Sequence, residues 1–258
     1  MRVFLLLSLN ALMLLEAYGF TDESDRQALF EFKSQVSLGK RAVLSSWDNT
    51  VHVCNWTGVT CGRKHKRVTR LELGGLQLGG MISPSIGNLT SLKEVGFGGN
   101  NIEGRIPDNI VRLTRMVYLD LSRNNFLGVF PPPIYNLSSL YVLNIFGNSF
   151  SGSLRADFGN LLPNLQRLFI GRNHFTGAIP TTLPNISNLQ MLGMEYNNLT
   201  GGIPSSFGKL WKLKELSLHS NFLGSGSFGD LEFLGGLTNC TKLEILEVGR
   251  NRLGGSLA

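Results

Sequence analysis

Residues 165–180 read "LQRLFIGRNHFTGAIP", and the recurrence of this stretch decides the fold. As a pattern it is L-x-x-L-x-L-x-x-N-x-L-x-G-x-I-P, which returns from Val68 onward with a period close to 24 residues. A repeat of this length is typical of a solenoid, in which each unit buries its apolar face only against its neighbours. We therefore predict that residues 68–258 stack as repeats around one continuous core.

Eight repeats can be counted, and the last is incomplete. They begin at Val68, Leu92, Met116, Leu140, Leu165, Leu189, Leu213 and Leu243. Seven of them carry an asparagine at the ninth position, namely Asn100, Asn124, Asn148, Asn173, Asn197, Asn221 and Asn251. An asparagine amide both donates and accepts hydrogen bonds, so it can satisfy backbone groups that a turning chain would bury unpaired. We expect these side chains to form an internal ladder.

Each repeat also predicts its own local structure. The "LxLxx" segment, such as Leu119–Arg123, alternates apolar and polar residues as a half-buried strand does. The glycine that follows the asparagine permits a tight bend, and Ile-Pro fixes an extended return. The 31 glycines of the chain are thus interpreted as turn residues of an α/β repeat fold, with parallel strands along one face.

The region before Val68 has a different character. Residues 1–19 contain Arg2, an apolar run from Val3 to Leu15 and small residues up to Gly19, which is the layout of a secretory signal peptide. Residues 20–67 are expected to form an N-terminal cap, with an amphipathic helix in "DESDRQALFEFKSQV". A cap of this kind shields the apolar end of the first repeat.

Other features agree with an extracellular location. Six N-x-S/T sequons predict N-glycosylation, at Asn55, Asn88, Asn136, Asn185, Asn198 and Asn239. Cys54 and Cys61, in "CNWTGVTC", are expected to form a disulfide, which leaves Cys240 as a buried small hydrophobe. We expect a protein that is secreted or lies on the outer face of the plasma membrane.

Composition and charge narrow the function classes. The net charge of +6 and the cluster "RKHKRVTR" at 63–70 allow a nucleic-acid partner, but a solvated basic turn in a secreted chain is the favoured interpretation. A weak attraction to an acidic wall polysaccharide or an acidic ligand stays open. No segment after the signal peptide is apolar enough to cross a bilayer. No metal-ligand spacing or Ser-His-Asp arrangement is present, so we expect neither a cofactor nor an enzyme.

The stretch Gly224–Gly229, "GSGSFG", fits G-x-G-x-x-G, the spacing of a kinase glycine-rich loop. It follows the ladder asparagine Asn221, at the point where the step between ladder asparagines lengthens from 24 to 30 residues. We interpret it as a flexible surface insertion in one repeat.

Together the cap motifs "DRQALFEFKSQV", "LSSWD" and "CNWTGVTCG" and the repeats ending in "GxIP" resemble the ectodomain of plant leucine-rich-repeat receptor kinases. The stretch "SGSLRADFGNLLPNLQRLFIGRNHFTGAIP" is most similar to the subgroup that contains the elongation-factor-Tu receptor. The resemblance implies a horseshoe-like leucine-rich-repeat solenoid that recognises a peptide or protein ligand and signals with a co-receptor kinase ectodomain. Such receptors continue into a membrane helix and a kinase, so the chain is interpreted as a truncated product or fragment without catalytic activity.

Ligand contacts are expected on the concave face, where the strands expose side chains that the core does not use. The candidates are Tyr118, Arg123, Tyr141, Phe146, Arg167, Phe169, Arg172, Tyr196 and His219. Aromatic residues and arginine are enriched at the energetic centres of interfaces, and such a surface suits a peptide with acidic groups or a free carboxylate. The alternative function is a secreted inhibitor of a wall-degrading enzyme, as in the polygalacturonase-inhibitor-like proteins.

Overall fold

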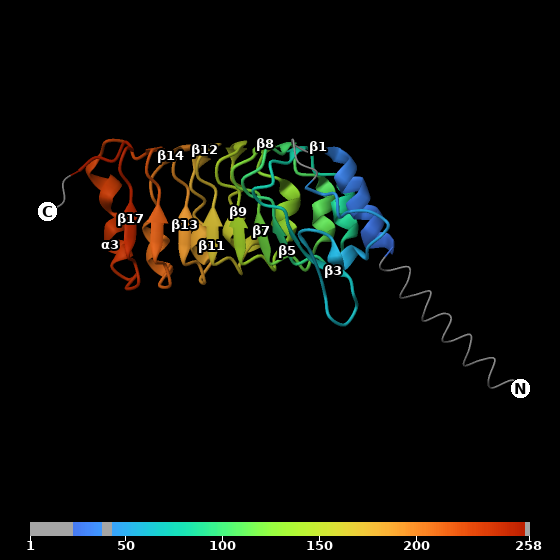
Figure 1. Cartoon of the computed structure of the whole chain (residues 1–258). Helices are drawn as coiled ribbons and strands as arrows, with labels where there is room; N and C mark the ends of the chain where they lie inside the picture. The colour runs from blue at the N-terminus through green and yellow to red at the C-terminus, as the bar shows by residue number, and fades with distance from the viewer. Residues whose placement is uncertain (1–22, 38–42, 256–258) are drawn as a thin grey trace, which may run out of the picture.

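The computed structural model describes residues 23–37 and 43–255. Figure 1 shows an elongated solenoid, with the N-terminal helix covering one end and the repeats following one another toward the other. The predicted signal peptide, residues 1–19, lies outside the described residues.

The main sheet has nine strands in the order β17-β15-β13-β11-β9-β7-β5-β3-β2. Their bounds are β2 Val59–Cys61, β3 Val68–Glu72, β5 Glu94–Gly96, β7 Tyr118–Asp120, β9 Val142–Asn144, β11 Arg167–Phe169, β13 Met191–Gly193, β15 Glu215–Ser217 and β17 Ile245–Glu247. All pairs from β3 to β17 are parallel, and equivalent residues of successive repeats are in register, as in Leu143 opposite Leu168. The predicted parallel strands are therefore present.

A second parallel sheet runs along the upper edge in Figure 1. It consists of β6 Glu103–Gly104, β8 Asn125–Val129, β10 Ser149–Ser153, β12 His174–Ala178, β14 Asn198–Gly201 and β16 Phe222–Leu223. The sequence predicted only a bend and an extended return here. Stacking explains the difference, because each extended return lies beside the next and forms a ladder with it.

Short helices close each repeat opposite the main sheet. They are η2 Pro84–Asn88, η3 Asp108–Arg112, η4 Pro132–Asn136, α2 Phe158–Leu161, η5 Leu183–Asn185, η6 Ser205–Lys209 and α3 Phe233–Leu237. Each buries at least one residue in the core, for example Ile110 and Phe207. The core between the two sheets and these helices is continuous along the described repeats.

The asparagines form the ladder inside the core. Asn173 is typical: its Nδ2 donates to the carbonyl oxygens of Ile145 at 3.0 Å and Ile170 at 3.1 Å, and its Oδ1 accepts from the Phe150 N–H at 3.0 Å. The amide thus joins the main-sheet strands of two repeats and the second-sheet strand of the earlier one. The same arrangement recurs from Asn100 to Asn251.

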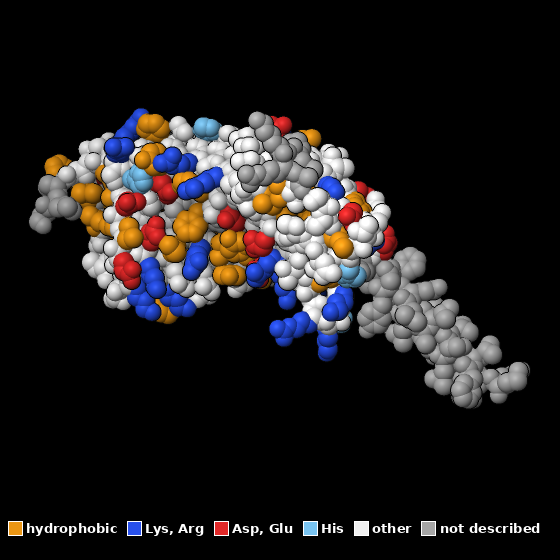
Figure 2. All heavy atoms as spheres, viewed as in Figure 1, with side chains coloured by type: hydrophobic (Ala, Val, Ile, Leu, Met, Phe, Trp, Pro, Cys, Tyr) orange, Lys and Arg blue, Asp and Glu red, His pale blue; other side chains and the backbone are white. Residues whose placement is uncertain are grey.

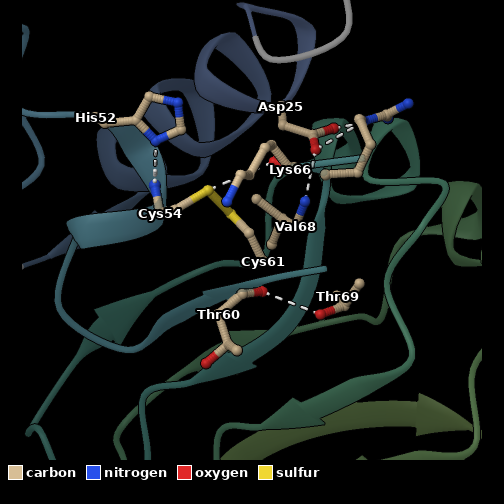
Figure 3. Close-up of a disulfide and its surroundings, with 9 residues drawn as sticks. Asp25, His52, Cys54, Thr60, Cys61, Lys66, Val68 and Thr69 are labelled. Carbon is tan, nitrogen blue, oxygen red and sulfur yellow. Dashed lines mark hydrogen bonds and ion pairs between the residues drawn. A yellow bond between two sulfur atoms is a disulfide. The ribbon is translucent and has the colours of Figure 1, made fainter. Parts of the chain in front are cut away.

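The cap is joined to the first repeats in three ways. The helix over residues 23–35 buries Leu29 and Phe32, and the Phe32 ring lies 5.4 Å from that of Phe97 in the second repeat. Strand β1, Val36–Ser37, pairs antiparallel with β4, Gly79–Gly80. Figure 3 shows the third link: fully buried Asp25 accepts from the guanidinium of Arg67 and the backbone N–H of Val68.

The disulfide lies beside this link. Cys54, in η1 Val53–Asn55, and Cys61, in β2, are joined with a Cα–Cα distance of 5.4 Å (Figure 3). The remaining cysteine, Cys240, is buried.

The glycine-rich insertion is more ordered than the sequence predicted. The Asp230 carboxylate, in η7 Phe228–Leu231, accepts from the backbone N–H groups of Ser225, Gly226, Ser227 and Gly254. These bonds hold the pKa of Asp230 far below its usual value. The stretch forms a hydrogen-bonded turn around one carboxylate.

Candidate ligand-binding surface

A groove runs along the outer face of the main sheet. Its volume is about 590 Å³, and its lining comes from the repeats of β3 through β15, with Tyr118, Phe146 and Phe169 among the side chains. Most lining residues occupy outward positions in or just after a strand, because side chains alternate between the two faces of a sheet, and Gly99 and Arg123 follow in the turn. The groove crosses the strands, so an occupant lying along it contacts several repeats at once.

A stack of side chains lies next to the groove, which we call the Arg172 stack; it comprises Phe146, Arg172, Tyr196 and His219. The Arg172 guanidinium lies 5.8 Å from the centre of the Phe146 ring and 4.7 Å from that of Tyr196. Tyr196 and His219 meet edge to face at 4.7 Å. Cation–π contacts of this kind hold a guanidinium flat between two rings and leave its N–H edge accessible.

The backbone under this surface is unusual. Arg123, Arg172 and Tyr196 have φ of 52°, 50° and 52°, in the left-handed region that side chains other than glycine rarely adopt. The equivalent positions of neighbouring repeats hold glycine at positive φ, as at Gly99 and Gly147. Large side chains therefore occupy positions whose backbone conformation glycine adopts most easily. The conformational strain is of order 1–2 kcal/mol for each such residue.

The structure brings together most, but not all, of the predicted contact residues. Tyr118, Arg123, Phe146 and Phe169 line the groove. Arg172, Tyr196 and His219 extend the surface through the stack, and Tyr196 and His219 also line an adjoining hollow. Tyr141 and Arg167 are exposed but line neither the groove nor the stack.

The sequence reasoning missed the acidic floor of the groove. Four carboxylates line it, from Glu72, Asp120, Glu195 and Glu215. Figure 2 shows red acidic side chains among orange hydrophobic and blue Lys and Arg side chains on the viewed face. Burial raises the pKa of Glu72; Arg70 opposes this rise, and the neighbouring Glu94 and Asp120 add to it. The pKa of Glu215 is raised by burial and then by Glu195 and Glu247.

Glycines deepen the floor. At Gly96 an added Cβ would collide with a carboxylate oxygen of Glu72, and at Gly98 it would lie 3.2 Å from Asp120 Oδ1. These two glycines occupy outward strand positions, where the sequence analysis considered only turn roles for glycine. Acidic residues alternating with glycine at equivalent strand positions were the signal that could have revealed the floor.

The predicted glycosylation sites lie away from this surface. All six sequon asparagines are exposed, and none lines the groove. Asn88, Asn136 and Asn185 end the short helices η2, η4 and η5, and Asn198 begins β14 of the second sheet. Glycans at these positions would leave the groove open.

The described residues form neither a metal site nor a membrane-spanning helix. Among them, no group of three or more His, Cys, Asp or Glu side chains is placed to hold a metal ion. None of the helices formed by these residues has the length and apolar character needed to cross a bilayer.

Comparison with protein families gives matches in the cap and the repeats. The family "Leucine rich repeat N-terminal domain" matches residues 22–62, and "Leucine rich repeat" families match residues 115–137, 139–161 and 163–223.

Among curated proteins, a probable LRR receptor-like serine/threonine-protein kinase of Arabidopsis thaliana is 74% identical over 92 residues, which is 36% of this chain and 9% of that protein. The LRR receptor-like serine/threonine-protein kinase EFR of the same plant is 60% identical over 75 residues, 29% of this chain and 7% of that protein. The chain therefore matches less than a tenth of each kinase, and the similarity is confined to the ectodomain.

Solved structures show the same relationship in three dimensions. The PEPR1–AtPEP1 complex matches with a TM-score of 0.78 and 32% identity, over 88% of this chain and 31% of that one. The Arabidopsis receptor kinase HAESA, in complex with the peptide hormone IDA and the co-receptor SERK1, matches with a TM-score of 0.72 and 28% identity, over 88% and 41%. The chain is thus a leucine-rich-repeat protein with the matching N-terminal domain, and it resembles the ectodomains of plant leucine-rich-repeat receptor kinases.

Proposed function

We propose that this chain is an extracellular recognition domain that binds a peptide or protein ligand in the groove of the main sheet. The Arg172 stack carries the proposal. It places a guanidinium between two aromatic rings at the edge of a groove. Aromatic and arginine side chains that cluster in this way are typical of the energetic centre of an interface.

The chemistry of the stack defines one ligand contact. Within the described residues the Arg172 guanidinium donates no hydrogen bond, so its N–H edge is free for a carboxylate of the ligand. Phe146 and Tyr196 add apolar area beside it. A carboxylate at this position is held by charge and by paired N–H donors, which is the recognition that the sequence predicted for the ligand.

The remaining parts of the proposal follow from the resemblance and the sequons. The similar solved ectodomains include ones in complex with peptides and with a co-receptor, and by analogy this chain acts with a co-receptor ectodomain. A role in plant immune recognition is proposed from the resemblance of the sequence to the elongation-factor-Tu receptor subgroup. Secretion and glycosylation are supported by six exposed sequons outside the groove. No observation favours the wall-enzyme inhibitor over this function.

The test is ligand capture with matched variants. The full chain is produced through a secretory host, immobilised, and exposed to a pool of short peptides from bacterial proteins, and the retained peptides are identified by mass spectrometry. Arg172→Ala should reduce retention about tenfold, a loss of roughly 1.4 kcal/mol. Arg63→Ala, in the exposed basic turn, should leave it unchanged. Retention that is equal in the wild type and Arg172→Ala, or no retained peptide, would refute the proposal.

A further inference from the structure

We propose that the groove selects a ligand with two basic side chains about six residues apart in an extended chain, one in each of two acidic hollows of its floor. The inference rests on the proposed function and names the ligand class. The sequence predicted an acidic ligand, whereas this inference places basic ligand side chains at the centre of the groove. The contact between a ligand carboxylate and Arg172 is unchanged.

The first hollow lies over Gly96 and Gly98 in the second repeat. These residues leave no side chain on the groove side, and carboxylates reach over them from both neighbouring repeats: Glu72 over Gly96, and Asp120 beside Gly98. Tyr118 forms one wall, and its hydroxyl lies 3.4 Å from Asp120 Oδ2. The result is an open space between two carboxylates, beside an aromatic ring.

The second hollow lies over Gly171 and Gly193. The Glu195 carboxyl group covers both glycines, with Oε2 3.0 Å from the place that a Cβ of Gly193 would take. This Oε2 atom is buried, and among the described residues it has no hydrogen-bond partner. A buried carboxylate oxygen without a donor is costly, so a ligand's donor would relieve this cost if the Glu195 side chain turned its carboxylate into the groove.

The floor carboxylates form no ion pair among the described residues, although Arg123 lines the groove and Arg70 opposes the rise that burial causes in the pKa of Glu72. Within residues 23–37 and 43–255, the ion pairs join Arg67 with Asp25, Arg70 with Glu94, Arg155 with Asp157 and His219 with Glu247. None of these pairs includes Glu72, Asp120, Glu195 or Glu215. The described residues also offer no three-ligand metal site, so a protein-borne ammonium or guanidinium fits the floor better than a metal ion.

The distance between the hollows sets the spacing in the ligand. The first lies at β5 and the second at β13, and the strands between them are β7, β9 and β11. Four inter-strand steps of ~4.8 Å give about 19 Å, which an extended peptide covers in about six residues at ~3.3 Å each. Phe146 and Phe169 line the groove between the hollows, so an apolar residue midway between the basic ones would be accommodated.

The experiment uses synthetic peptides as probes. Peptides of equal length, with blocked ends, carry two lysines three, six or nine positions apart, a phenylalanine midway and otherwise serine and glycine. Binding to the full chain is measured by isothermal titration calorimetry at low and high salt. The six-position peptide should bind about tenfold more tightly than the other two, and added salt should weaken it because the floor is partly exposed.

Variants assign the effect to the floor. Asp120→Asn and Glu195→Gln keep the size of the side chain, and the double variant should lose about tenfold or more in affinity for the six-position peptide. Glu103→Gln is the matched control, because it removes the same charge from an exposed position of the second sheet. Equal thermal melting of all variants shows that the change is in binding.

The outcomes separate the two proposals. Lysine peptides that bind no better than an uncharged peptide, or that bind independently of spacing and of the double variant, overturn the basic-pair inference. If Arg172-dependent capture of natural peptides still occurs in that case, the proposed function stands. If capture also fails, both proposals fall.

Discussion

The ladder asparagines make a quantitative test of how the solenoid is held together. Each interior ladder carbonyl receives two amides: Ile145 O accepts from Asn148 and Asn173, and Ile170 O accepts from Asn173 and Asn197. Asn173→Ala therefore leaves both carbonyls with one donor, and only the buried Phe150 N–H loses its partner. One orphaned buried donor costs about 1–3 kcal/mol of the free energy of unfolding.

The first ladder residue lacks this redundancy. Among the described residues, Asn100 is the only amide side chain that donates to Leu73 O, and its Oδ1 accepts from the Leu78 N–H. Leu73 and Leu78 are fully buried, so Asn100→Ala orphans an acceptor and a donor together. We expect a loss of about 2–6 kcal/mol, roughly twice that of Asn173→Ala.

The assay is urea denaturation followed by circular dichroism, with the midpoint and slope compared among variants. Asn125→Ala, at an exposed position of β8, is the control and should stay within about 0.5 kcal/mol of the wild type. An Asn173→Ala variant that is destabilised as much as Asn100→Ala would refute the shared-donor reasoning.

Three further predictions concern the cap and the insertion. Asp25→Asn removes the charge of the fully buried partner of Arg67 and should destabilise the chain by about 3 kcal/mol in the same assay, whereas Asp25→Asn with Arg67→Met should recover part of the loss. Replacing Cys54 and Cys61 by serine should cost about 2 kcal/mol, because the disulfide closes a small loop; an equal midpoint for the reduced and oxidised chain would contradict this. The pKa of Asp230 is lowered on folding, so its contribution is present above its unfolded pKa of about 4 and is lost as pH falls below that value. Hydrogen exchange of the Ser225–Ser227 amides should accelerate in Asp230→Asn at neutral pH, and unchanged exchange would count against the role of this carboxylate.

The main sheet and the ladder were predictable because their signals recur in phase. The alternation around Leu119 or Leu168 indicates a strand within one repeat, and the asparagine four residues after that strand needs no distant partner to be recognised. The second sheet was missed for the opposite reason. Strand β12, His174–Ala178, contains Gly177 at a φ of 78°, which in isolation indicates a turn. Its pairing exists only with the neighbouring repeats, where β10 and β14 supply the hydrogen bonds.

The candidate site likewise has a part that the sequence predicts and a part that it does not. Arg172 and Tyr196 could be proposed from residue type, since large side chains at outward positions are visible in one repeat. The acidic floor requires three repeats at once: Glu72 reaches over Gly96 because that residue has no side chain, and Asp120 approaches from the far side. Residues 24 positions apart in sequence become neighbours only when the repeats stack. The sequence of one repeat shows the glycine but does not show the hollow that the next repeats form over it.

The two charges of the surface explain why residue type alone gave an incomplete ligand. Arginine and aromatic side chains at the edge indicate an acidic partner, yet the floor beside them holds four carboxylates that form no ion pair within the described residues. A purely acidic ligand would pair with Arg172 at the edge and leave the floor carboxylates unpaired. A purely basic ligand would pair with the floor and leave Arg172 unpaired. Since desolvating an unpaired carboxylate opposes binding, affinity and selectivity both favour a peptide whose basic side chains enter the hollows while a carboxylate meets Arg172. Such a charge pattern also excludes most competing peptides, because each mismatched charge faces a like charge fixed on the sheet.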